Sequence, residues 1–174
     1  HTLLFLLLTS TLLYGQAFVT TWKTDNPGTS NDNEITIPTT GSGYNYTVDW
    51  GDGTSDTGIT GDITHTYASA GTYTVAITGD FPRIYFNLTG DRQKLITIEQ
   101  WGDIAWTSMN GAFNGCINMT MPATDTPNLT NVTSMFRAFS RCSKFNGDIS
   151  SWDVSNVTNM FAMFALARDF NQNI

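Results

Sequence analysis

The chain has 174 residues and a mass of 19.2 kDa, enough for one ordinary domain or two small ones. Charged residues make up 13% of it, roughly half of the usual share in globular domains, and aromatic residues make up another 13%. This composition excludes a disordered chain. The net charge of −7 argues against nucleic-acid binding, which needs a basic surface.

The first 16 residues have the pattern of a secretory signal segment. The apolar run from Leu3 to Tyr14 is too short to span a bilayer, which takes roughly 20 apolar residues, but it has the length of a signal-peptide h-region. Gly15-Gln16-Ala17 offers a small-residue cleavage site. Because no charged n-region precedes the run, we expect residues 1–16 to be a signal peptide truncated at its start. We expect the mature chain to be secreted or displayed at the cell surface, without a transmembrane span.

The composition changes near residue 90. Residues 17–90 contain 8 acids and 2 bases, whereas residues 91–174 contain 7 acids and 6 bases, and all Met and Cys residues lie in this second half. We therefore expect two domains, 17–90 and 91–174, that pack by different rules.

Short runs of alternating apolar and polar residues dominate the first half. They occupy residues 34–37, 44–48, 72–77 and 83–86, and each is bounded by Gly, Pro, Asn or Asp. Alternation with turn residues at the ends predicts strands, and no segment between them has a helical period. The first half is therefore predicted to be a small antiparallel β-sandwich.

Three motifs in this half resemble the PKD domain, an immunoglobulin-like β-sandwich. They are Trp50-Gly51-Asp52-Gly53, then His65-Thr66-Tyr67, then Gly71-Thr72-Tyr73-Thr74-Val75. The two glycines of the first motif permit the positive φ values of a tight hairpin. Trp50 and Tyr73 are expected to point inward as anchors of the core.

Carboxylates near this turn are weak candidates for a calcium site, because hard cations prefer clustered carboxylates. Asp49, Asp52 and Asp56 are the candidates, but their spacing does not match an EF-hand loop, and we favour solvated turn-forming aspartates. His65, the one histidine after the signal segment, has no nucleophile motif near it. We expect it to be a hydrogen-bonded structural residue. The sequence predicts no catalytic residues, no metal and no cofactor.

The second half repeats itself every 25 or 26 residues. The repeat ladder consists of Met109, Met135 and Met160; Phe113, Phe139 and Phe164; and Cys116 and Cys142, whose phase Ala167 occupies in the third copy. Equivalent residues of successive units should stack into one apolar core. The Met-x-x-x-Phe spacing predicts a short helix in each unit, for example over residues 158–165.

The repeats resemble the BspA-like family of bacterial surface proteins. The resemblance rests on Ala112-Phe113-x-x-Cys116 and Ala138-Phe139-x-x-Cys142, followed by residues 148–160, and covers about residues 95–174. It implies a leucine-rich-repeat solenoid with short strands and short helices, incomplete at its C-terminus. The expected fold class is therefore mixed, a sandwich followed by this solenoid. The family is implied to adhere or to bind proteins, without catalytic residues.

The two cysteines hold the same phase in adjacent units. An exported pair can form a disulfide, but a cysteine in such a ladder also packs as a small buried hydrophobe. We favour two buried thiols.

Two functions from different classes fit the sequence. The first is a non-catalytic, monomeric surface protein that binds an extracellular protein or polysaccharide, with the sandwich as a spacer. The candidate exposed residues are Arg137, Arg141, Lys144, Arg168, Asp148 and Asp153. The alternative is a non-catalytic accessory region of a secreted hydrolase whose catalytic domain follows residue 174.

Overall fold

The computed structural model describes residues 17–173, so the expected signal segment lies outside the described residues. Seven strands and no helix occur in this range. The strands are β1 (Phe18–Lys23), β2 (Glu34–Ile37), β3 (Asn45–Asp49), β4 (Ser55–Ile59), β5 (Ile63–Thr66), β6 (Thr72–Asp80) and β7 (Leu95–Gln100).

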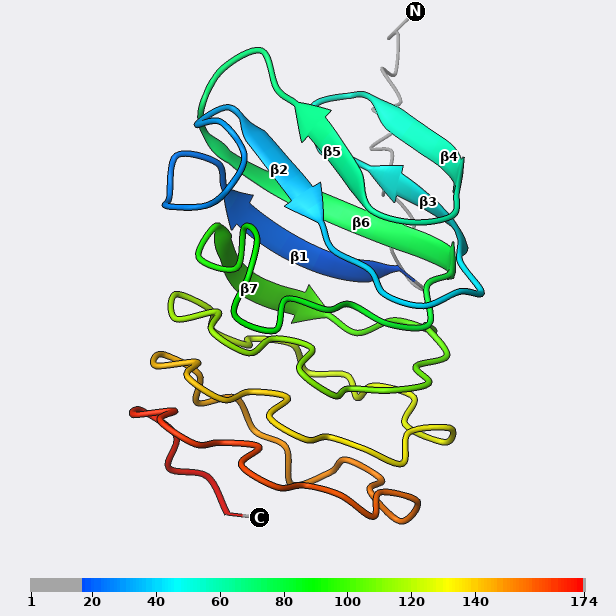
Figure 1. Ribbon diagram of the computed structural model, residues 1–174, viewed down its shortest axis with the longest axis vertical. Helices are drawn as coiled ribbons and strands as arrows, with labels where there is room; N and C mark the ends of the chain where they lie inside the picture. The colour runs from blue at the N-terminus through cyan, green and yellow to red at the C-terminus, as the bar shows by residue number, and fades with distance from the viewer. Residues whose placement is uncertain (1–16, 174) are drawn as a thin grey trace, which may run out of the picture.

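The strands form two antiparallel sheets that face each other at one end of the molecule (Figure 1). The larger sheet has the order β4-β3-β6-β1-β7, and the smaller one pairs β2 with β5. In β2 the buried Ile35 and Ile37 alternate with half-buried polar residues, which is the pattern of a strand with one face in the core. This end of the molecule is a β-sandwich.

The strand β7 connects the sandwich to the second half of the chain. It pairs antiparallel with β1, with Thr20 opposite Ile98 and Thr21 opposite Thr97. Just beyond it, Trp101 stacks on Phe18 of β1 at a centroid distance of 5.7 Å. The buried residues of the two halves form one continuous hydrophobic core rather than two.

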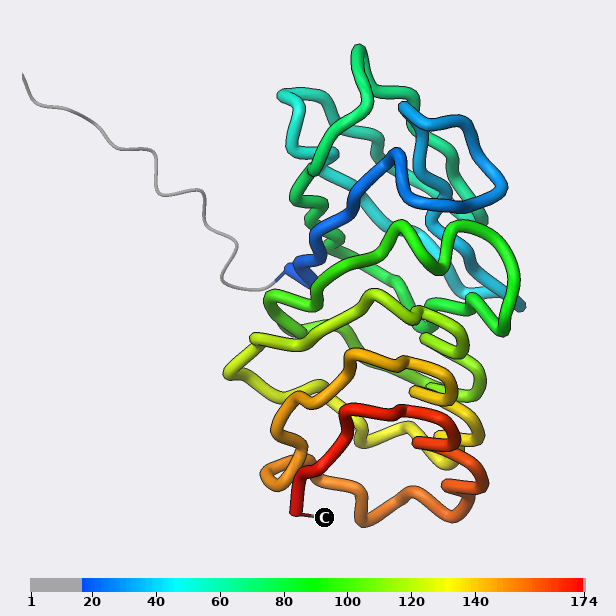
Figure 2. Tube along the Cα trace, turned by 90° about the vertical axis from the view of Figure 1, so that its left-hand side faces the viewer, coloured from blue at the N-terminus to red at the C-terminus, as the bar shows by residue number. Residues whose placement is uncertain are grey.

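The second half is a stack of four turn-rich segments, which we call tiers (Figure 2). Tier 1 is residues 83–94, tier 2 is 108–119, tier 3 is 134–145 and tier 4 is 159–170. Backbone N–H groups of each tier donate to carbonyl groups of the next, as from Phe86 to Ala112 at 3.0 Å and from Gly111 to Phe136 at 2.9 Å. The 25- to 26-residue spacing in the sequence is thus the distance along the chain between neighbouring tiers.

The predicted mixed fold class is wrong. The described residues are all-β, with sheets of five and two strands and no helix, so the leucine-rich-repeat solenoid with short helices is not found. Residues 158–165, expected to be helical, form tight turns in which Met163 N–H bonds the Met160 carbonyl at 3.1 Å. The physical reason is the positive φ of Ala162 (56°) and of its tier 3 equivalent Arg137 (54°), because a right-handed helix requires negative φ.

The strand expected over residues 83–86 is also wrong. This segment is extended but lies in no sheet, and it forms part of tier 1 instead. Tyr85 N–H bonds the Pro38 carbonyl and Phe86 N–H bonds the Ala112 carbonyl, so the segment bridges the sandwich and tier 2. Its alternating pattern arises because Ile84 and Phe86 are buried while Tyr85 is only half-buried.

Two fully buried charged residues of tier 1 hold the loop between β1 and β2. The Asp91 carboxylate accepts bonds from the backbone N–H groups of Thr29, Ser30 and Thr36 at 2.7–3.0 Å. Lys94 Nζ donates to the Ser30, Asn31 and Glu34 carbonyls at 2.8–3.1 Å. The Ser30 hydroxyl joins the two, since it lies 2.6 Å from Asp91 Oδ2 and 2.7 Å from Lys94 Nζ. We call this arrangement the Asp91–Lys94 clamp.

The clamp explains a local sequence requirement and a pKa. A Cβ atom on Gly28 would lie 2.4 Å from Asp91 Oδ1 and 2.6 Å from Lys94 Cε, so the loop needs glycine there. Burial raises the pKa of the Asp91 carboxyl, but the hydrogen bonds from Ser30 and Thr36 outweigh that effect. The pKa of Asp91 therefore lies below its usual range, and the clamp holds a charged carboxylate inside the protein.

Candidate functional site

The turn between β3 and β4 carries the first of the PKD-like motifs. Gly51 has a φ of 75°, and a Cβ atom there would lie 2.2 Å from the Thr74 carbonyl oxygen, so no other residue fits. Gly53 has a φ of 89° but faces open space. Asp52 Oδ1 accepts from the Thr54 N–H at 2.9 Å, which closes the turn.

His65 is the centre of an aromatic stack. Its ring lies flat on Trp50 at 4.6 Å and meets the edge of Tyr67 at 4.6 Å, and Tyr67 stacks on Tyr73 at 3.7 Å. Its Nε2 lies 2.9 Å from Asp52 Oδ2. The sequence predicted a hydrogen-bonded structural histidine without naming the partner, which is Asp52. Gly71, the remaining motif glycine, lies against the Tyr73 ring, and its N–H bonds the Thr24 hydroxyl at 2.9 Å.

The three calcium candidates are occupied by hydrogen bonds within the sandwich. Asp49 Oδ1 accepts from Gly51 N–H, Asp56 Oδ2 accepts from Trp50 Nε1 at 2.8 Å, and Asp52 bonds Thr54 and His65. Burial raises the pKa of Asp52, but the bonds from Thr54 and His65 outweigh it and lower the pKa to about 2. Within residues 17–173 no group of three or more His, Cys, Asp or Glu residues could hold a metal ion.

The repeat ladder lies in the core of the stacked tiers. The rings of Phe113, Phe139 and Phe164 stack in sequence, at 5.5 Å between the first two and 5.9 Å between the last two. Ladder residues of tiers 2 and 3 are fully buried, namely Met109, Phe113, Cys116, Met135, Phe139 and Cys142. Met160 of tier 4 is instead 42% exposed.

Both cysteines are free, buried thiols. Cys142 Sγ donates to the Phe113 carbonyl at 3.0 Å. Burial raises the pKa of the Cys142 thiol to about 12 and raises that of Cys116 as well. A thiol held protonated in this way is a poor nucleophile and a poor metal ligand.

A groove with a volume of about 340 Å³ crosses one face of all four tiers. Two columns of residues in the same phase line it. The first column is Leu88, Gly115, Arg141 and Leu166, and the second is Arg92, Ile117, Ser143 and Arg168. No carboxylate belongs to either column, so three arginines and four apolar or small side chains form the groove, together with Gln93.

The backbone conformation of the first column sets the groove's shape. Leu88, Gly115, Arg141 and Leu166 all have positive φ, between 60° and 91°. A Cβ atom on Gly115 would lie 2.8 Å from both Arg92 Cδ and Leu88 Cδ2. The missing side chain of Gly115 therefore leaves room for the aliphatic part of Arg92 within the groove.

The three arginines have no acidic partner. The ion pairs found in the described part of the chain are Lys23–Asp25 and His65–Asp52, both in the sandwich. Arg92, Arg141 and Arg168 make no side-chain hydrogen bond to any residue from 17 to 173. Their charges are therefore available to a ligand.

A smaller pocket of about 180 Å³ adjoins the groove and shares Leu88, Arg141 and Leu166 with it. Asn114 and Arg137 line its other side. Asn114 is 1% exposed, and its Oδ1 atom has no hydrogen-bond partner among the described residues. A buried acceptor without a donor is costly, so this oxygen favours a ligand that carries a hydroxyl or amide N–H.

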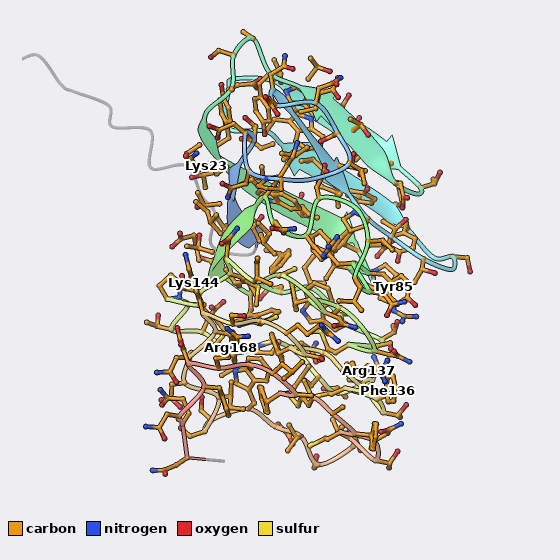
Figure 3. The ribbon with its side chains drawn as sticks, turned by 60° about the vertical axis from the view of Figure 1, so that its left-hand side comes forward. Lys23, Tyr85, Phe136, Arg137, Lys144 and Arg168 are labelled. Carbon is orange, nitrogen blue, oxygen red and sulfur yellow. The ribbon has the colours of Figure 1, made fainter. Side chains whose placement is uncertain are left out.

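Figure 3 shows Lys144 and Arg168 toward one side of the second half, and Arg137, Phe136 and Tyr85 toward the other. The Arg137 guanidinium lies 5.0 Å from the centre of the Phe136 ring. Of the exposed candidates from the sequence, Arg141 and Arg168 line the groove and Arg137 lines the adjoining pocket. Asp148 and Asp153 line neither cavity, and each caps a local turn through Ser150 or Ser155.

The sequence analysis missed Arg92, because the repeat was counted only from the unit that contains Met109. Arg92 lies 25 residues before Ile117, and Asp91 and Lys94 lie 25 before Cys116 and Met119. The same phase thus identifies tier 1, although its buried positions carry charges instead of Cys and Met.

A larger cavity of about 470 Å³ lies where the sandwich meets the second half, beside Phe81, Pro82 and Ile104. Asp80 and Asp103 are its charged lining residues. It offers an anionic ligand no cation, in contrast to the groove.

The geometry defines an all-β protein with a β-sandwich at one end and an arginine-lined groove across the other. Comparison with protein families places both halves: residues 31–80 match the PKD domain, and residues 85–174 match the family described as Mycoplasma protein of unknown function, DUF285. Since the second match covers just over half of the chain, the chain belongs to the DUF285 family.

The two matches suggest an extracellular or surface protein. They support the PKD resemblance, whereas the BspA-like leucine-rich repeats are not shown by them. No curated protein and no solved structure matches the chain. Among residues 17–173, no helix has the length and apolarity to cross a membrane.

Proposed function

We propose that this chain is a non-catalytic surface or secreted binding protein whose groove binds an acidic polysaccharide. The observation that carries the proposal is the set of three unpaired arginines, Arg92, Arg141 and Arg168, in one groove that contains no carboxylate. The rest of the protein is acidic, with a net charge of −7 overall, so this concentration of unpaired positive charge is local.

The arrangement of the groove favours a polymer. Arg92, Arg141 and Arg168 come from tiers 1, 3 and 4, so their guanidinium groups are distributed along the stack. Arginine binds carboxylate and sulfate groups through paired N–H donors, and a chain with regularly spaced anions can reach all three.

Sugar hydroxyls also suit the neighbouring pocket. The unpartnered Asn114 Oδ1 needs a donor, and a polysaccharide supplies hydroxyl groups beside each anionic group. The apolar side chains of Leu88, Ile117 and Leu166 lie between the charges, where they can pack against the apolar faces of sugar rings.

The test is calorimetric titration of the full chain with heparin and with hyaluronan, against neutral dextran. We expect binding to at least one acidic polymer and none to dextran, weakening as NaCl rises from about 50 mM to about 300 mM. Arg141→Ala and Arg168→Ala should each weaken binding about five- to tenfold, the value of one charged contact of about 1–1.4 kcal/mol.

The matched control is Lys23→Ala, which removes an exposed cation from the sandwich and changes the net charge equally. It should leave the affinity unchanged. Binding of poly-glutamate as tight as that of either polysaccharide would replace the sugar with an acidic peptide as ligand. Failure of every anionic polymer to bind would overturn the proposal.

A further inference from the structure

The tiers are joined by a regular row of backbone hydrogen bonds. From tier 2 to tier 3, four alternate N–H groups donate at 2.9–3.1 Å, those of Met109, Gly111, Phe113 and Gly115. From tier 3 to tier 4, the equivalent donors are Met135, Arg137, Phe139 and Arg141, at 2.7–3.0 Å. The N–H groups between them bond within their own tier, so each tier presents one complete row of donors to its neighbour.

The same row in tier 4 has no acceptors. The equivalent residues, 25 positions further along the chain, are Met160, Ala162, Phe164 and Leu166. None of their N–H groups has an acceptor within residues 17–173. The stack therefore ends in four parallel donors whose spacing has already been used twice within the molecule.

Apolar side chains surround these donors. A pocket of about 380 Å³ lies at the same end, lined by Ile149, Trp152, Met160, Met163 and Phe164. Met160 is 42% exposed and Leu166 is 59% exposed, whereas the Met135 and Phe139 side chains in the tier above are fully covered by tier 4.

We propose that this open end binds an extended apolar peptide segment of a partner protein, aligned parallel to residues 160–166. Alternate carbonyl groups of the peptide accept from Met160, Ala162, Phe164 and Leu166, and its apolar side chains enter the pocket beside Trp152. The contact continues the interface that tier 3 makes with tier 4, as strand addition continues a sheet. A second copy docking by the same surface is disfavoured, because it would bring donors against donors.

Tier 4 is itself the template for the ligand. The carbonyls that accept from tier 3 belong to Asn159, Phe161, Met163 and Ala165. The probe is therefore a fluorescent synthetic peptide with the sequence of residues 150–170, titrated into the full chain. We expect saturable binding, and Met160→Asp should weaken it about tenfold or more, because a buried carboxylate would lack a partner.

The matched control is Ile117→Asp, since Ile117 is 38% exposed but lines the groove on the other tiers. It should leave peptide affinity unchanged, as should Arg141→Ala. Hydrogen exchange supplies the second measurement: the amides of Met160, Ala162 and Phe164 should exchange fast in the free protein and become protected when the peptide binds.

Equal affinity in Met160→Asp and the unmodified chain, or protection that appears elsewhere, would overturn the proposal. Absence of peptide binding would also overturn it. A dimer in sedimentation that Met160→Asp dissolves would assign the end to a second copy instead. Because Arg141→Ala reports on the groove alone, failure here is distinguishable from failure of polysaccharide binding.

Discussion

Replacing Lys94 with methionine should destabilise the protein by about 3–5 kcal/mol. Lys94 is fully buried, and its Nζ bonds three backbone carbonyls and the Ser30 hydroxyl. Methionine retains most of the volume, and Met119 occupies the equivalent position in tier 2. The substitution therefore removes the charge without opening a large cavity.

The magnitude follows from what remains after the change. Three carbonyl groups of the loop lose a charged donor, and each such bond contributes about 1.5–3 kcal/mol. The Asp91 carboxylate stays buried without the nearby cation. These losses overlap because all of them pass through the same loop, so the total should lie near the cost of breaking one buried ion pair rather than at their sum.

Urea unfolding of the full chain measures the effect, with the slope on denaturant checked for constancy. Asp91→Asn and the double variant complete a double-mutant cycle. We expect a coupling of about 1 kcal/mol or more, since the Ser30 hydroxyl bonds both side chains. Lys23→Met is the control, and its exposed ion pair should contribute no more than about 1 kcal/mol.

If Lys94→Met lay within about 1 kcal/mol of the unmodified chain, the reasoning would fail. Apolar burial at this position would then outweigh the hydrogen bonds, as it does at Met119. An additive double-mutant cycle would separately show that Asp91 and Lys94 act independently.

Three further predictions concern the sandwich and the thiols. Gly51→Ala should cost more than about 2 kcal/mol in thermal unfolding, from positive φ and a clash with a carbonyl, and Gly53→Ala should cost less because its side faces open space; equal costs would contradict this. The lowered pKa of Asp52, about 2, adds stability that is present above the carboxyl's usual pKa and is lost as pH falls from about 4 toward 2; Asp52→Asn should lose less over that range, and an identical loss in both proteins would refute the assignment. A thiol reagent at about pH 8 should label Cys116 and Cys142 only after unfolding in urea, and rapid labelling of the folded protein would show that the burial is transient.

The sequence predicts the sandwich better than the second half, for a physical reason. Alternation over residues 34–37 corresponds to β2 without error, because one face of that strand is buried and the other is not. Residues 83–86 have the same alternation but bond to tier 2, so alternation indicates an extended segment without naming its partner. β7 was missed because Leu95–Gln100 follows the composition change and was assigned to the repeats.

The predicted helix fails on a property that composition does not encode. Met-x-x-x-Phe spacing places two side chains on one side of either a helix or a series of tight turns. Only the positive φ of Arg137, Arg141, Ala162 and Leu166 distinguishes the two, and no residue type at those positions announces it. Three arginines near the groove could be named from the sequence as exposed, but their convergence with Arg92 depends on tier stacking.

The pairing of β1 with β7 constrains the order in which the chain can fold as it is made. β1 is complete at Lys23 and finds its inner partner β6 by Asp80, but its other edge stays unpaired until Gln100 has been synthesised. An open strand edge is a template for pairing with another chain. During synthesis and export, the sandwich therefore has a vulnerable interval of about 20 residues, and a chain shortened to the PKD-like half would carry that exposed edge permanently.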